Sequence, residues 1–212
     1  DESLRQEVKA WLAENWTQDI SKELLNEQIY WEVSAARKNW LKKVVEARWA
    51  VPSWPEEWHG RAIANEQASI IEREFAKVRA PGAGQDRNNL WANTLLAQGQ
   101  QGLKEKLIGP LLRSEVNMCL LYSEPGAGSD LAGIRTRADK QGDHYLVNGQ
   151  KVWTSGAATA EYGMLVARTN WDVPKQPGIS FFFCPMKQSG VEVRPLTVSS
   201  KPLTPRTDLR DY

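Results

Sequence analysis

The chain has 212 residues, and its 27 Lys and Arg nearly balance its 26 Asp and Glu, which gives a formal net charge of +1. This balance provides no field that would favour nucleic acid or a membrane surface as a partner. The length suits one or two domains with a sizeable core. The chain contains no apolar run of about 18 residues, and its charged start does not match a signal peptide.

The first half of the chain has helical periodicity, because apolar residues recur every three or four positions. Pro52 and Pro55 break the pattern and predict an ordered loop around them. Seven of the ten tryptophans fall in the first 60 residues, and we expect most of them to fill the core or an interface. The helices that we expect are one after a capping box at Ser3 and Gln6, one over 21–48, one over 63–78, and one over 89–113 interrupted near Gly99 and Gly109–Pro110.

After Glu115 the pattern changes to short segments rich in β-branched and aromatic residues. Asn148-Gly149 is typical of a type I′ hairpin turn. Closely spaced strands without intervening helices predict an antiparallel barrel or sandwich. The fold class is therefore α+β, with an all-α N-terminal domain followed by an antiparallel β-barrel or sandwich domain. The strands that we expect lie over 118–123, 134–139, 144–147, 150–155, 162–168, 179–186 and 191–196.

Several kinds of site do not fit the sequence. The only histidines, His59 and His144, have no metal-ligand spacing with Cys119 and Cys184. Both cysteines lie in apolar runs and are expected to be buried small side chains in a reducing compartment. The chain has no G-x-S-x-G elbow and no P-loop. The G-A-G of the turn after the first expected strand fails the dinucleotide-binding test, because Leu131 stands at the third glycine and a strand is expected to follow.

That turn closes the segment LLYSEPGAGSD, residues 120–130. Gly126 and Gly128 would let the backbone take positive φ and approach a ligand or another segment closely. On this segment alone, a structural turn in which Ser129 and Asp130 bond their own backbone is the favoured interpretation.

Further motifs change that interpretation. The segment KVWTSGA follows at 151–157, GVEVRPL at 190–196, and WAVPSWPEEWHG precedes them at 49–60. Taken in order, these motifs resemble the acyl-CoA dehydrogenase family over residues 2 to 197. The segment WAVPSWPEEWHG resembles a loop that ends in two glycines in the family, and one departure is His59, which replaces the first of these glycines.

The resemblance implies an N-terminal helical domain over 1–115 and a middle β domain over 116–197. The segment over 198–212 departs from the family pattern, and its polar composition with Pro202 and Pro205 leads us to expect a disordered or aberrant tail. The family binds FAD and oxidises the Cα–Cβ bond of acyl-CoA thioesters, and an electron-transfer flavoprotein usually reoxidises the cofactor. The expected ligands are therefore FAD and an acyl-CoA thioester, with no metal, nucleic acid or membrane.

The resemblance also implies roles for particular residues. Ser129 would contact both cofactor and thioester ligand, with Gly128 beside it. Glu124 is expected to fix the turn and to have no catalytic part. The expected flavin contacts are Trp153 against the ring, Ser155 near N5, Thr154 beside them, and Leu120, Tyr122 and Ser123 at the pyrimidine edge.

The family has a third, C-terminal four-helix domain, which carries the catalytic glutamate and much of the dimer contact. No residue of this chain matches that glutamate. We expect a truncated or frameshifted form of a longer protein, and the alternative is a non-catalytic half-subunit that assembles with a full-length relative. Homo- or hetero-oligomers would form through the missing domain. The expected location is the cytoplasm of a bacterium, or the mitochondrial matrix of a eukaryote.

Overall fold

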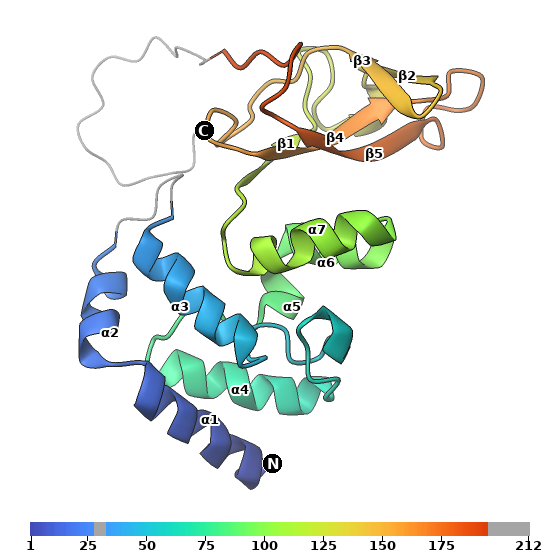
Figure 1. Cartoon of the computed structure of the whole chain (residues 1–212). Coiled ribbons are helices and arrows are strands. Elements are labelled where there is room, and N and C mark those ends of the chain that lie inside the picture. The colour runs from blue at the N-terminus through green and yellow to red at the C-terminus, as the bar shows by residue number, and fades with distance from the viewer. Residues whose placement is uncertain (28–32, 195–212) are drawn as a thin grey trace. The chain divides into compact units, whose positions relative to one another are not determined.

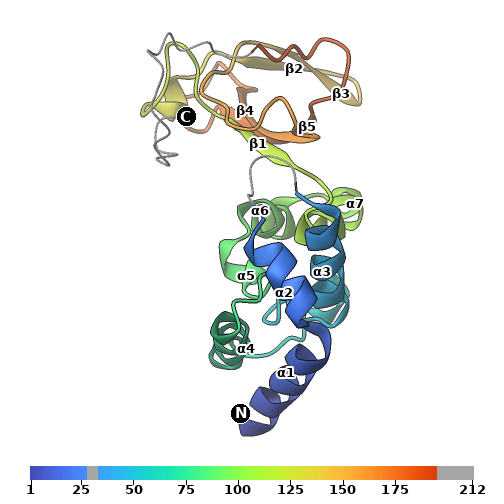
Figure 2. The ribbon, with the colours of Figure 1, turned by 90° about the vertical axis from the view of Figure 1, so that its left-hand side faces the viewer.

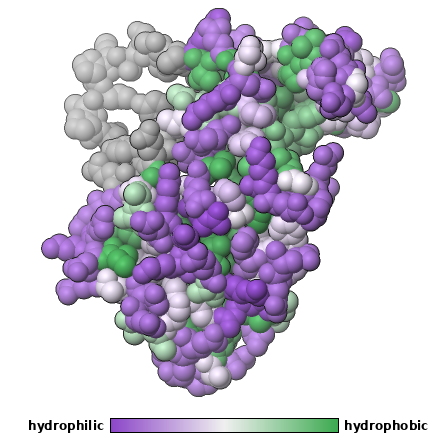
Figure 3. Space-filling view, in the orientation of Figure 1, coloured by the Kyte–Doolittle hydropathy of each residue, from purple (hydrophilic) through white to green (hydrophobic). Residues whose placement is uncertain are grey.

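The computed structural model describes residues 1–27 and 33–194. The chain divides into two compact units, Asp1–Val116 and a second unit that begins at Asn117. Polar residues cover most of the helical unit's face seen in Figure 3, with apolar patches between them.

The first unit is helical (Figure 1). α1 packs along α4, and α6 lies against α7, as Figures 1 and 2 both show. The α-helices are α1 (Glu2–Asn15), α2 (Gln18–Leu25), α3 (Ala35–Glu46), α4 (Asn65–Lys77), α5 (Gln85–Asn88), α6 (Leu90–Gln98) and α7 (Gln101–Leu112), and a 3-10 helix covers Glu56–Trp58.

Three helix predictions need correction. The capping box is wrong, because α1 already begins after Asp1. The single helix over 21–48 is also wrong: α2 ends at Leu25, and α3 begins where the Ser34 hydroxyl accepts a hydrogen bond from the Arg37 amide at 3.1 Å. The part of this prediction over 28–32 lies outside the described residues.

The third correction concerns the interruption at Gly109–Pro110. α7 continues through Pro110, although a proline inside a helix costs about 3 kcal/mol. Four apolar neighbours of this pair are buried, and their packing outweighs the lost hydrogen bond. They are Leu107, Ile108, Leu111 and Leu112. The interruption near Gly99 and the loop around Pro52 are confirmed.

Tryptophans form much of the core of the helical unit, as expected. The Trp11 ring stacks on Phe75, with centroids 5.9 Å apart, and contacts Trp40 at 5.6 Å. The Trp40 side chain is 2 % exposed, and its indole N–H donates to the Pro81 carbonyl at 2.8 Å. The indoles therefore bury apolar area while the Trp40 donor keeps a partner.

The second unit contains one five-stranded sheet among its described residues. Its strands are β1 (Met118–Leu121), β2 (Arg137–Gln141), β3 (His144–Asn148), β4 (Tyr162–Arg168) and β5 (Ile179–Pro185). β4 is central: it pairs in parallel with β1, in parallel with β2 at Arg137–Arg168, and antiparallel with β5. The helical region followed by a β domain is confirmed, but the purely antiparallel sheet is wrong. The long connection after β1 brings the chain back in the direction that makes β4 parallel to it.

The β2–β3 hairpin folds over the layer formed by β1, β4 and β5 (Figure 2). Ala138 of β2 packs on Leu165 and Ala167 of β4, and all three side chains are buried. The rings of Tyr145 and Phe182 meet edge to face with centroids 5.0 Å apart. The β domain is thus one mixed sheet arranged in two layers.

The turn of that hairpin is not at the predicted place. It lies at Gly142, whose φ of 63° is left-handed, between the paired residues Gln141 and His144. Gly149 serves a close approach instead, because a Cβ there would lie 2.7 Å from the Cα of Thr136. β3 ends at Asn148, and residues 150–155 form no strand, so the strand predicted there is wrong.

The last predicted strand, over 191–196, is absent from its described part, 191–194. The rest of that strand and the tail expected from 198 lie outside the described residues. Cys119 is buried, as expected, whereas Cys184 is only half-buried, and both thiols are free.

Candidate functional site

The site begins at the turn that follows β1. Glu124 and Ala127 exchange backbone hydrogen bonds of 2.8 and 3.1 Å across Pro125 and Gly126. Pro125 suits the second position of such a turn because its φ is fixed. The prediction of positive φ at Gly126 and Gly128 is wrong. Both face open space, with no atom within 4 Å of where a Cβ would stand.

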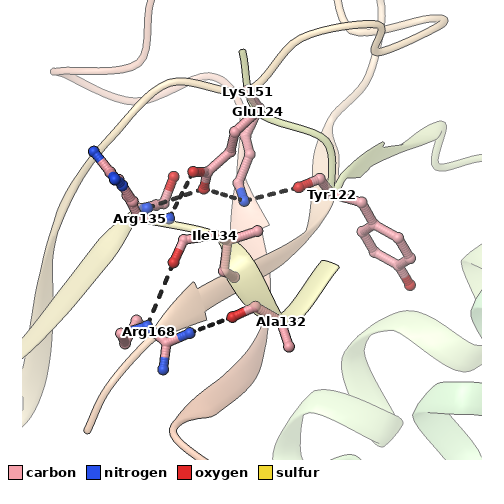
Figure 4. A network of polar contacts seen from close by, with 8 residues as sticks. Tyr122, Glu124, Ala132, Ile134, Arg135, Lys151 and Arg168 are labelled. Atoms are coloured by element: carbon pink, nitrogen blue, oxygen red, sulfur yellow. Dashed lines mark hydrogen bonds and ion pairs between the residues drawn. The ribbon is translucent and has the colours of Figure 1, made fainter. Parts of the chain in front are cut away.

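The Glu124 carboxylate holds this turn from inside (Figure 4). It accepts hydrogen bonds from the Arg135 amide at 2.6 Å, the Thr136 amide at 2.9 Å and the Lys151 ammonium at 2.9 Å. Burial alone would raise the pKa of Glu124, but these bonds outweigh burial and lower the pKa to about 2. The carboxylate is therefore charged at neutral pH, and it anchors the turn as expected.

Lys151 brings a second segment to the turn. Its ammonium also donates to the Tyr122 carbonyl at 3.0 Å, and the amide of Val152 donates to the Ser123 carbonyl at 2.9 Å. Burial lowers the pKa of Lys151, and Glu124 opposes that shift. These bonds place the strand end with Tyr122 and Ser123 beside the chain that leads into Trp153.

Trp153 stands at an unusual backbone position. Its φ is 58°, in the left-handed region that bulky residues rarely adopt, and its side chain is 68 % exposed. A large apolar ring held out into solvent on strained backbone is typical of a functional site. The next residue, Thr154, buries a hydroxyl that has no hydrogen-bond partner among the described residues. Ser155 is exposed.

Arg168 holds the far end of the same loop (Figure 4). This side chain of β4 is 5 % exposed, and it donates to the carbonyls of Ala132 at 2.5 Å and Ile134 at 3.4 Å. It also lies 5.2 Å from the Trp171 ring centroid. The loop between β1 and β2 is thus fixed by a buried carboxylate at one end and a buried guanidinium at the other.

The other predicted residues lie along the same stretch of chain. Leu120 is on β1 and 38 % exposed. The half-buried ring of Tyr122 meets Phe181 edge to face at 6.0 Å. Gly128 and Ser129 are exposed at the tip of the loop. Hydrogen bonds of the described residues tie Tyr122 and Ser123, but not Gly128 or Ser129, to the segment before Trp153.

A hollow of about 480 Å³ opens beside the turn. It is lined by residues 124–126 of the turn, by Asp130 and Gly133, by Arg135 and Thr136 just before β2, and by Gly149 and Gln150. Its volume is within the range of small-molecule sites. None of the eight predicted cofactor residues lines it. The candidate site is therefore the surface around the strand end and Trp153, with the hollow next to it.

Sequence reasoning missed Lys151 and Arg168. Lys151 belongs to the KVWTSGA motif, so a basic residue inside an otherwise apolar and hydroxyl-bearing motif was an available signal. Nothing in the sequence around Arg168 points to the carbonyls that it reaches. In the described part of the chain, no three or more His, Cys, Asp and Glu are grouped to hold a metal, and no helix there is long and apolar enough to cross a membrane.

Comparison with known proteins identifies the family of the chain. A model described as the acyl-CoA dehydrogenase N-terminal domain matches residues 1–115, and one described as the middle domain of the same family matches residues 119–205. The chain belongs to the acyl-CoA dehydrogenase family.

Similar proteins include acyl-CoA dehydrogenase IpdE1 of Mycobacterium tuberculosis, which is 33 % identical over 199 residues, covering 92 % of this chain and 51 % of IpdE1. The ChsE4–ChsE5 complex from Mycobacterium tuberculosis has a TM-score of 0.61 and 31 % identity, over 88 % of this chain and 46 % of that one. A variant of the Tcur3481–Tcur3483 steroid ACAD has a TM-score of 0.64 and 28 % identity, over 89 % and 49 %. The chain spans about half the length of these relatives.

Proposed function

We propose that the chain supplies the flavin-contacting and thioester-contacting part of an acyl-CoA dehydrogenase. The supporting observation is the meeting of two segments that are far apart in sequence. The Val152 amide donates to the Ser123 carbonyl at 2.9 Å, which brings the LLYSEPGAGSD strand end against the KVWTSGA segment. These are the segments to which the family resemblance assigns the flavin.

The residues present fit the isoalloxazine ring of FAD. Such a ring needs an apolar wall and polar groups at its edge, and the exposed Trp153 indole offers the wall. The buried Thr154 hydroxyl lacks a partner among the described residues and could serve as an edge donor. FAD, when bound, supplies the two-electron acceptor for α,β-dehydrogenation.

The chain's own residues would bind and orient. Trp153 would cover one face of the ring, and Tyr122, Ser123, Thr154 and Ser155 would provide polar contacts at its edge. Donors at that edge stabilise developing negative charge, and one such donor is typically worth about 10²-fold in rate.

At the loop tip, Gly128 leaves open space and Ser129 is exposed, which suits contact with an acyl-CoA thioester. The resemblance assigns no residue of this chain to removal of the α-proton. In the complete enzyme an electron-transfer flavoprotein would reoxidise the cofactor.

Titration of the purified chain with FAD, followed by flavin fluorescence, tests the cofactor part. We expect saturable binding, and Trp153→Ala should weaken it by about tenfold, because loss of ring stacking removes roughly 1 kcal/mol or more. Trp171→Ala is the matched control, since Trp171 is also half exposed (49 %) in the same unit. No binding by the wild-type chain, or equal effects of the two substitutions, would refute the proposal.

The thioester part is tested on the FAD-loaded chain with a panel of acyl-CoA thioesters. The panel includes a steroid thioester, because one similar structure is a steroid ACAD. A change in the flavin absorption spectrum that Ser129→Ala weakens would support the assignment. A spectrum that no thioester changes would count against it.

A second candidate function is that of a partner subunit. It is favoured by the similarity to the ChsE4–ChsE5 complex and by the half-length match. In this case the chain would co-elute with a full-length acyl-CoA dehydrogenase relative at micromolar concentration. Separate elution of the two proteins would remove this candidate.

A further inference from the structure

Glu124 and Lys151 form the most buried ion pair among the described residues of the β unit. Each side chain is 7 % exposed, whereas in every other ion pair there at least one partner is 40 % exposed or more. Exposed pairs contribute little, but breaking a buried pair leaves one charge without compensation. The substitution of either residue is therefore expected to have a strong local effect.

The pair adds side-chain contacts to the backbone hydrogen bond that links the 150–155 segment to the strand end. Residues 150–155 form no strand, and one backbone hydrogen bond, from Val152 to Ser123, links them to the strand end. A single backbone bond adds little net stability. The Lys151 ammonium adds two contacts, to the Tyr122 carbonyl at 3.0 Å and to Glu124 at 2.9 Å.

Glu124 extends the connection to a third segment. Its two oxygens also accept the amides of Arg135 and Thr136, at 2.6 and 2.9 Å. One carboxylate thus fixes the strand end, the segment just before β2 and the Lys151 segment together (Figure 4).

Lys151 and Trp153 differ in burial although they are only two residues apart. Lys151 is directed into the unit, while Trp153, two residues later, is 68 % exposed. In extended backbone these two side chains would lie on the same side. The left-handed φ of 58° at Trp153 turns the chain, and such strained backbone persists only where surrounding contacts hold it. The buried contacts of Lys151 lie two residues before it.

We propose that Glu124 and Lys151 are positioning residues, which hold the Trp153–Ser155 segment against the Tyr122–Ser123 strand end so that both can contact one ring. The inference rests on the proposed flavin function. It differs from a purely stabilising role, which would lower the stability of the whole unit without loosening these segments in the folded protein.

The test compares the wild-type chain with Lys151→Met, which removes the charge but keeps most of the length, and with Glu124→Gln, which keeps the shape. Lys187→Met is the matched control, because Lys187 is 71 % exposed in its ion pair with Glu161. Two quantities are measured below the melting temperature of every variant. They are the FAD dissociation constant and, without FAD, amide hydrogen exchange over 150–155 and over β4.

We expect Lys151→Met to raise the FAD dissociation constant by about tenfold or more, and to speed exchange over 150–155 by a similar factor, with β4 unchanged. Glu124→Gln should act in the same direction, and Lys187→Met should match the wild type. If folded Lys151→Met exchanges its amide hydrogens over 150–155 at the wild-type rate, the inference is overturned.

The remaining outcomes are also decisive. If Lys151→Met does not fold, Glu124→Gln takes its place, and unfolding of both would show that the pair holds the whole unit and overturn a role confined to two segments. If the wild-type chain binds no FAD, the proposed function fails, and the positioning role for a flavin fails with it. Faster exchange over 150–155 in the variant would then still show that the pair holds the segments together.

Discussion

Gly149→Ala is the substitution whose effect follows most directly from the structure. A methyl group at this position would lie 2.3 Å from Oγ1, 2.6 Å from Cβ and 2.7 Å from Cα of Thr136, where ordinary contacts begin at 3.4 Å. The segment after β3 must therefore move by roughly 1 Å away from buried backbone, and overpacking of this kind costs about 1–3 kcal/mol. Reduced freedom of the unfolded chain returns about 0.4–1 kcal/mol. The net expectation is a loss of about 1–2 kcal/mol.

Calorimetric unfolding of the β unit measures this loss. For a unit of this size, 1 kcal/mol shifts the melting temperature by about 4–8 °C, so Gly149→Ala should melt about 5–15 °C below the wild type. Gly128→Ala is the control, because its φ is not left-handed and no atom lies within 4 Å of the added methyl group. It should melt at the wild-type temperature or slightly above. Equal melting of the two variants would show that the Gly149 segment relaxes freely, and would refute the argument from close approach.

Three further predictions concern single side chains. The folded pKa of Glu124 is about 2, below its ordinary value of 4.5, so the carboxylate's stabilising contribution is complete above pH 4.5 and is lost as pH falls from 4.5 towards 2. Acid titration should therefore lower the stability of the wild type by about 3 kcal/mol more than that of Glu124→Gln. Parallel titrations of the two proteins would contradict this. Thr154→Val should leave stability unchanged or higher, because it removes a buried hydroxyl with no partner among the described residues, while it weakens FAD binding; tighter or equal binding would exclude a cofactor contact. Burial, with a smaller contribution from Cys184, raises the pKa of Cys119 to about 11. Iodoacetamide at pH 8 should therefore modify Cys119 about 10²-fold more slowly in the folded than in the unfolded protein, and more slowly than it modifies the half-buried Cys184. Mass spectrometry that finds Cys119 modified first would contradict its burial.

The sequence by itself determined many of the local elements and the family. Apolar spacing of 3.6 residues located α4, and aromatic and β-branched runs located β1, β4 and β5. The motifs around Ser129 and Trp153 indicated the family before any contact was known. These features depend on neighbours within a few positions of one another, so the order of residues is sufficient to predict them.

Only the tertiary structure decided the strand directions and the charged groups behind the candidate site. The chain after Gly149 looked like a strand, but it pairs with no strand among the described residues. It is held there in part by Lys151, whose carboxylate partner is 27 positions earlier. Arg168 reaches a carbonyl 36 positions away. Whether such a charge is solvated on the surface or buried against a partner depends on which segments fold against each other, and local sequence does not carry that information.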